Sequence, residues 1–161
     1  MESIITIATV LTMYFNAAND VTSNYLYNSD LEDGVIHKIE VYEQKDNNQV
    51  CAKMEYHYEY DEQGRLTTRE VMRWDSNKNN WVNEFRHTYK YYKNGYNLEV
   101  SYWNNQKQAY DLPAEVTLYR SQAPNLTSVK IYKMNEKQDN MYLSGSMIVM
   151  EPIEYRLLAI K

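Results

Sequence analysis

Residues 50–60 read Val-Cys-Ala-Lys-Met-Glu-Tyr-His-Tyr-Glu-Tyr, and this stretch decides the fold. Its even positions carry apolar or aromatic side chains and end in Tyr56, Tyr58 and Tyr60, while most of the odd positions between them are charged or polar. Successive side chains of a β-strand point to opposite faces, so the alternation predicts a strand with one aromatic and one polar face.

The same alternation recurs further along the chain. Apolar side chains occupy nearly every second position from Trp81 to Tyr91 and again from Tyr110 to Leu118. We expect these three runs to present their apolar sets on one shared inner face. Pro113 has no N–H group for a ladder, so it predicts a bulge or an edge in the third run.

Turn signals divide the runs at a regular interval. Gly34, Gly64, Gly95 and Asn125 follow one another at spacings of 30, 31 and 30 residues, and Gly and Asn tolerate the positive φ angles of tight hairpins. A second set of turns, rich in Asn, falls midway between them, at residues 46–48, 77–80, 104–106 and 139–140. The chain therefore predicts tandem β-hairpins of about 30 residues.

These elements predict an all-β domain of about nine antiparallel strands in an up-and-down meander. We find no amphipathic helix in the sequence that would cover the aromatic face. The sheet must then curl into an open or closed barrel, fold over as a β-sandwich, or use a partner or a second copy as its cover. We rank the barrel first and the sandwich second.

The N-terminus carries an apolar run, Ile4–Phe15, that is too short to span a bilayer and fits the core of a signal peptide. Small residues follow at Ala17 and Ala18. We expect residues 1–18 to be a signal peptide and residues 19–161 to form a single domain, which places the protein in the periplasm or outside the cell. The alternative is a β-branched first strand of a cytoplasmic protein.

Composition limits the partners. The 161 residues include 17 Tyr but only 2 Phe and 3 Trp, so the core is expected to be thin and partly wet. A net charge of −5 argues against nucleic acid and against anionic membrane surfaces as partners. The single cysteine, Cys51, excludes an intrachain disulfide and a cysteine-based zinc site.

Two segments, residues 58–66 (YEYDEQGRL) and 89–98 (YKYYKNGYNL), resemble the Tyr-Asp repeat of large surface and toxin-shell proteins, whose general form is Y-x-Y-D-x-x-G-x-L. The whole chain also resembles small exported proteins of unknown function from gut Bacteroidetes. These resemblances imply a β-hairpin repeat and an envelope location, and they imply no catalytic residue.

Motifs for catalysis, metal or cofactor binding are not evident. His37, His57 and His87 are the only histidines, and the alternation places His57 and His87 on opposite faces, which argues against a shared metal site. No Gly-x-Ser-x-Gly sequence is present to expose a serine. We therefore predict no catalytic residue, no metal and no cofactor, and we lean against an enzyme.

The aromatic side chains are the remaining candidates for a binding site. They could form a stacking platform for sugars or peptides, or they could simply be the core of a thin sheet. Trp74 and Trp103 flank Asn-rich turns, so we expect them to be the most exposed of the set. The candidate residues are Trp74, Trp81, Trp103, Tyr56, Tyr58, Tyr60, Tyr89 and Tyr91.

The sequence thus favours an exported, non-enzymatic binding or adaptor protein that holds a glycan, a peptide or an envelope protein. The alternative is a small β-barrel that carries an apolar ligand inside it. An enzyme ranks third.

Overall fold

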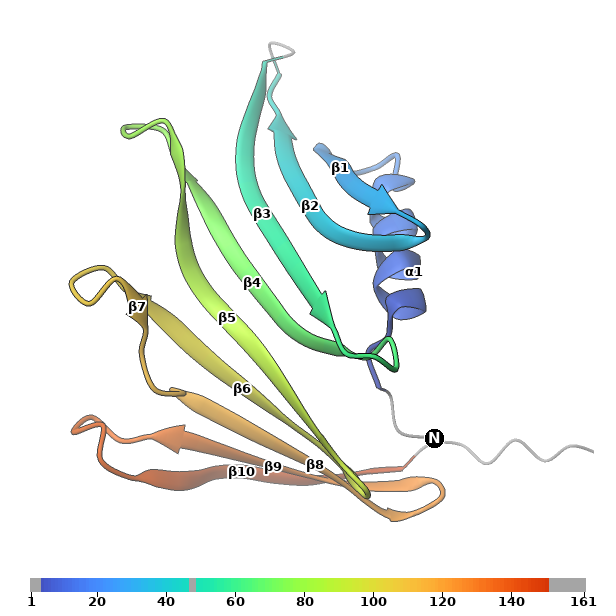
Figure 1. The fold of residues 1–161 in the computed structure, drawn as a ribbon, viewed down its shortest axis with the longest axis vertical. Helices are drawn as coiled ribbons and strands as arrows, with labels where there is room; N and C mark the ends of the chain where they lie inside the picture. Colours follow the sequence, from blue (N-terminus) through green and yellow to red (C-terminus); the bar gives the residue numbers. More distant parts are fainter. Residues whose placement is uncertain (1–3, 47–48, 151–161) are drawn as a thin grey trace, which may run out of the picture.

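The computed structural model describes residues 4–46 and 49–150, and its strands form one curled antiparallel sheet (Figure 1). The ten strands are β1 (Tyr25–Glu32), β2 (Val35–Gln44), β3 (Val50–Tyr60), β4 (Leu66–Asp75), β5 (Asn80–Tyr92), β6 (Gly95–Asn104), β7 (Ala109–Tyr110), β8 (Glu115–Ala123), β9 (Leu126–Met134) and β10 (Met141–Met150). Their order in the sheet follows the chain, except that the short β7 pairs beside β6. β1 and β10 form the two edges, so the sheet stays open. The predicted up-and-down meander is confirmed in its open form, and neither a closed barrel nor a sandwich is observed.

The glycine turns lie where the spacing predicts them. Gly34 and Gly64 have φ angles of 79° and 69° in the β1–β2 and β3–β4 turns, and Gly95 begins β6 with a φ of 144°. Positive φ is unfavourable for residues with a Cβ atom, which explains glycine at these positions.

The Asn-rich turns are built by side chains that accept hydrogen bonds from the turn backbone. Asp75 Oδ1 accepts from the Asn77 amide at 3.0 Å, and Asn104 Oδ1 accepts from the Gln106 amide at 3.0 Å. These short polar side chains satisfy backbone donors that the ladder leaves unpaired.

The faces of β5 differ from the prediction. Phe85 pairs with Val71, but Asn83 pairs with Met72, so Glu84 forms a bulge. Beyond the bulge the alternation is shifted by one residue. Trp81 consequently lies on the face opposite to Phe85, whereas the sequence predicted a shared face.

The third aromatic run is interrupted at Pro113. β7 ends at Tyr110 and β8 begins at Glu115, because proline cannot donate to the ladder. Thr117 pairs with Leu98 and so lies on the inner face, while Leu118 pairs with Asn97 on the outer face. The prediction that Leu118 faces inward is therefore wrong.

The N-terminal run is a helix, α1 (Ile7–Ala18), where the sequence left open a signal peptide or a first strand. The strand alternative does not form. The helix begins after Thr6, whose hydroxyl accepts a hydrogen bond from the Thr9 amide at 3.4 Å, a cap that favours a helix start. Spacings of three or four residues place Val10 and Tyr14 on one side of the helix.

α1 covers the β1–β2 end of the concave face (Figure 1), and the core lies beneath it. The sequence predicted no helix to cover this face, and that prediction is wrong. The buried core cluster comprises Val10, Ile36, Ile39, Val41, Leu66 and Tyr89. No helix among residues 4–46 and 49–150 is long and apolar enough to cross a membrane.

Candidate binding pocket beneath the N-terminal helix

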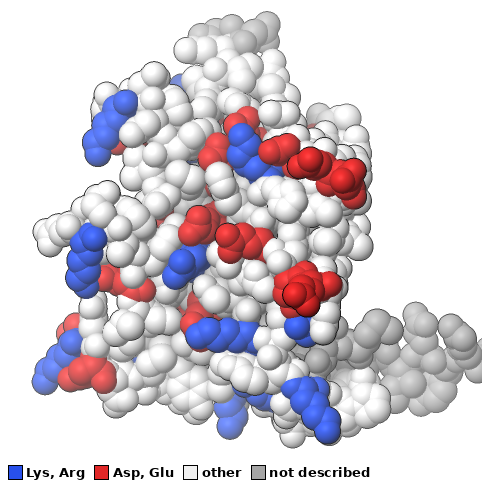
Figure 2. Space-filling model, viewed as in Figure 1, with Lys and Arg blue, Asp and Glu red and all other residues white. Residues whose placement is uncertain are grey.

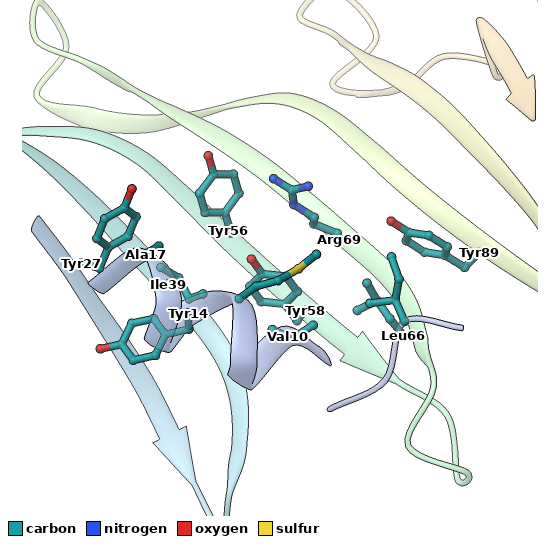
Figure 3. A pocket seen from close by; sticks show the side chains of 12 residues that line it. Val10, Tyr14, Ala17, Tyr27, Ile39, Tyr56, Tyr58, Leu66, Arg69 and Tyr89 are labelled. Carbon is teal, nitrogen blue, oxygen red and sulfur yellow. The ribbon is translucent and has the colours of Figure 1, made fainter. Parts of the chain in front are cut away.

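A pocket of about 230 Å³ lies between α1 and the concave face of the sheet (Figure 3). Its helix wall includes Val10, Met13 and Tyr14. Its sheet wall includes Tyr27, Ile39, Tyr56, Tyr58, Arg69 and Tyr89, from β1 to β5. The pocket therefore combines an apolar floor with tyrosines and a single cation.

Backbone hydrogen bonds hold the start of α1 against the β3–β4 turn. The Ile7 amide donates to the Gly64 carbonyl at 3.0 Å, and the Leu66 amide donates to the Ile5 carbonyl at 2.8 Å. The Tyr91 hydroxyl donates to the Leu66 carbonyl at 2.6 Å. The first two bonds tie the start of α1 and the residues before it to the β3–β4 turn.

Arg69 lies in the middle of the sheet wall. It stands opposite Tyr58 on one side and His87 on the other, so all three side chains share the concave face. Its guanidinium carbon lies 4.7 Å from the centre of the Tyr56 ring, a cation–π contact. Two buried nitrogens here, Arg69 Nε and His87 Nδ1, have no hydrogen-bond partner among the described residues.

Burial controls the charges around this cation. It raises the pKa of Tyr58 to about 12, and it raises the pKa of Tyr89 above its usual value. Burial, aided by the positive charge of Arg69, lowers the pKa of His87 to about 4. At neutral pH the tyrosines and His87 are therefore neutral, and Arg69 is the charged group among them.

The tyrosines predicted as binding residues do gather on the concave face. Tyr56, Tyr58 and Tyr89 line the pocket. Tyr60 and Tyr91 pack against the core cluster beside it. The Tyr60 hydroxyl donates to the Ile36 carbonyl at 2.9 Å, so it is already engaged within the chain.

The predicted tryptophans lie apart from these tyrosines, at the hairpin ends. Trp74 and Trp81 pack edge to face with ring centres 5.0 Å apart, and Trp103 packs in the same way on Tyr110 at 5.0 Å. All four are half-buried, as are Tyr56, Tyr58 and Tyr60, so the expected greater exposure of Trp74 and Trp103 stays a prediction. The eight predicted residues thus form separate groups instead of one platform.

Sequence reasoning missed Arg69 and the helix residues that line the pocket, and also His87, which stands beside Arg69 on β5. Residues 65–74 mix charged and apolar side chains on both faces, so their inner face could not be assigned from the pattern. His87 did carry a signal, because it stands between Phe85 and Tyr89 in an aromatic run.

The outer, convex face carries charges in cross-strand rows. Lys38, His57, Glu70 and Arg86 are successive register partners from β2 to β5. His57 Nε2 lies 2.5 Å from the buried Glu55 carboxylate. In Figure 2 acidic and basic side chains are interspersed over most of the visible face, and several acidic side chains lie next to one another at its upper right. No cluster of three or more potential metal ligands occurs among the described residues.

Comparison with known protein families shows which family the chain matches. A family profile described as a family of unknown function, DUF3836, matches residues 1–121. The chain belongs to DUF3836. A search of curated proteins found no match.

Solved structures from Bacteroides species share the fold of this DUF3836 member. A crystal structure of a protein with unknown function from Bacteroides fragilis NCTC 9343 is 26% identical, with a TM-score of 0.69, and the match covers 80% of this chain and 93% of that one. A DUF3836 family protein from Bacteroides vulgatus ATCC 8482 is 28% identical, with a TM-score of 0.56, over 60% of this chain and 98% of that one. The predicted likeness to Bacteroidetes proteins of unknown function is thereby confirmed.

Proposed function

We propose that this chain is an exported, non-enzymatic binding protein that holds its ligand on the concave aromatic face of the sheet. The observation that carries the proposal is the pocket beneath α1, where tyrosines and Arg69 from β1, β3, β4 and β5 line one cavity. Binding sites in proteins are typically concave and apolar with a few convergent polar groups. Glycans, peptides and envelope proteins remain the proposed ligand classes.

The binding surface can be tested by screening glycan and peptide arrays with the purified chain. We expect Tyr56→Ala, on the concave face, to weaken any captured ligand, and Trp74→Ala and Trp103→Ala, at the hairpin ends, to leave it unchanged. If Trp74→Ala and Trp103→Ala weaken binding and Tyr56→Ala does not, the binding site lies at the hairpin ends instead. Equal unfolding midpoints of the variants would show that each comparison reports binding and not folding.

Export rests on the apolar run Ile4–Phe15 and on the small residues Ala17 and Ala18. Cell fractionation tests whether the protein is exported, and intact-mass measurement tests whether residues 1–18 are removed. A mature chain that begins at Asn19 would lack the helix wall, and the pocket would then become an open groove on the sheet. An uncleaved chain in the cytoplasm would contradict export and leave α1 as a permanent wall.

A carrier of an apolar ligand is the second candidate, and the same cavity favours it. The open sheet has no barrel interior, so such a ligand would lie between α1 and the sheet.

Two further expectations from the sequence stay predictions. One is the likeness of residues 58–66 and 89–98 to Tyr-Asp repeats. The other is self-association through the part of the sheet face that α1 leaves open. Light scattering at several protein concentrations would test the association.

A further inference from the structure

Four arginines among the described residues stack on tyrosine rings, and three of them also have an acidic, amide or carbonyl oxygen nearby. Arg65 lies over Tyr91 at 4.4 Å and donates to Asp61 at 2.7 Å. Arg69 is the exception, because no carboxylate, amide or carbonyl oxygen of the described residues pairs with its side chain.

The other two arginines are likewise compensated. Arg120 lies over Tyr92 and donates to the Asn97 side chain at 2.6 Å. Arg86 lies over Tyr110, with the Glu70 carboxylate 4.0 Å away, although its buried Nε, like that of Arg69, has no hydrogen-bond partner among the described residues. In contrast, Arg69 has the Tyr56 ring and the nearby Tyr58 hydroxyl as its contacts.

A half-buried guanidinium without an anion is costly, because a ring and a hydroxyl replace only part of the hydration that it loses. Arg69 lines the pocket, and His87 is its register neighbour on the same face. Arg69 Nε and His87 Nδ1 are both buried and have no hydrogen-bond partner among the described residues. Arg69 is thus a cation without a carboxylate partner at the wall of an apolar pocket.

We propose that the pocket, in the chain that retains α1, binds a small apolar carboxylate, with its carboxylate at Arg69, beside His87, and its apolar tail among Val10, Ile39 and Leu66. A carboxylate offers two acceptor oxygens and one negative charge, which matches the single guanidinium in the pocket lining. Arg69 belongs to β4, so the head-group site persists whether or not α1 is retained.

The cavity volume limits the length of the tail. At ~30 Å³ for each water-sized group, a cavity of about 230 Å³ has room for roughly eight such groups. An unbranched acid such as octanoate, or an aryl acid of similar size, fits this volume. Larger ligands would have to displace α1 or extend past its end.

This inference rests on the proposed function, ligand binding by the concave face. One set of titrations tests the preference for a carboxylate separately from apolar binding in the pocket. The purified chain is titrated by calorimetry with octanoate, octan-1-ol and octylammonium. We expect octanoate to bind about tenfold or more tightly than octan-1-ol, since a charge-assisted pair supplies at least that difference. Octylammonium is expected to bind more weakly than either.

Arg69→Gln should remove the preference for octanoate over octan-1-ol. Arg65→Gln is the matched control and should keep that preference. It also removes an arginine that stacks on a tyrosine, but this arginine is paired with Asp61. Equal binding of octanoate and octan-1-ol, unaffected by Arg69→Gln, would overturn the carboxylate inference and leave apolar binding in the pocket intact. Absence of binding by all three probes would overturn the inference, and the array experiment would then decide the proposed function.

A measurement on the unsubstituted chain covers the case in which Arg69→Gln does not fold. With histidines isotopically labelled, octanoate should shift the ring signals of His87 and leave those of the exposed His37 in place. Octanoate binding without a shift at His87 would place the ligand elsewhere and overturn the assignment.

Discussion

Gly95 lies so close to Tyr119 on the neighbouring strand that a Cβ atom at position 95 would stand 1.9 Å from the Tyr119 carbonyl oxygen. The obstacle is backbone, so no side-chain rotation relieves it. We expect Gly95→Ala to lower the free energy of unfolding by about 3 kcal/mol, through overpacking and a strained positive φ. Urea denaturation measures the change.

Gly34→Ala is the control for this prediction. Gly34 also has a positive φ, 79°, but no heavy atom beyond its chain neighbours lies within 4 Å of a Cβ there. Its cost should be limited to backbone strain, about 1 kcal/mol. Equal losses for the two variants would show that the approach to Tyr119 contributes nothing.

Val10 anchors α1 to the sheet, with only 3% of its surface exposed. In the full-length chain, Val10→Asp should undock the helix, because burying an unpaired carboxylate costs about 3 kcal/mol. Hydrogen exchange at the Leu66 amide, which bonds the Ile5 carbonyl, should accelerate. Met13→Asp, at a site with 60% exposure, should leave that exchange unchanged.

His87 should make stability depend on mildly acidic pH. Burial lowers its pKa to about 4 from the usual 6.5, so between these values the unfolded chain binds a proton that the folded chain does not. This contribution to stability is complete above about pH 6.5 and is lost as the pH falls toward 4. Urea midpoints measured across this range should fall less steeply for His87→Gln than for the unsubstituted chain. His37→Gln, at an exposed position, should keep the original slope.

The edge-to-face pair of Trp74 and Trp81 should stabilise its hairpin. A double-mutant cycle with Trp74→Ala and Trp81→Ala should give a coupling energy of about 1 kcal/mol. Trp74 and Trp103 belong to different hairpins, so their alanine substitutions should be additive within about 0.5 kcal/mol. Additivity for the first pair would mean that the rings act independently.

Strands and turns could be predicted because their signals are local. Alternation over residues 50–60 and glycine at 34, 64 and 95 each require only a few neighbouring positions. The helix was missed because β-branched residues such as Ile5, Thr9 and Val10 favour strands by propensity. Packing against the sheet overrides that preference, and no pattern within residues 4–15 reports what lies beneath them.

The faces of later strands were predicted less well for a related reason. One bulged residue, Glu84, or one proline, Pro113, reverses every assignment beyond it. The pocket was predicted only through its tyrosines, since the importance of Arg69 depends on which acceptors lie near it in space. That Arg69 has no carboxylate partner becomes apparent only when the side chains of the neighbouring strands are compared.

The order of the strands also bears on how the protein assembles. Each strand of the main path pairs with strands adjacent in sequence, or separated only by the short β7, so most pairings close short loops and cost little chain entropy. α1 is different: the Tyr91 hydroxyl reaches the Ile5 carbonyl at 3.5 Å across 86 residues of chain. The segment that leads into the helix therefore contacts β5 directly, and we expect docking of α1 to couple the unfolding of β1–β5 more tightly than that of β6–β10.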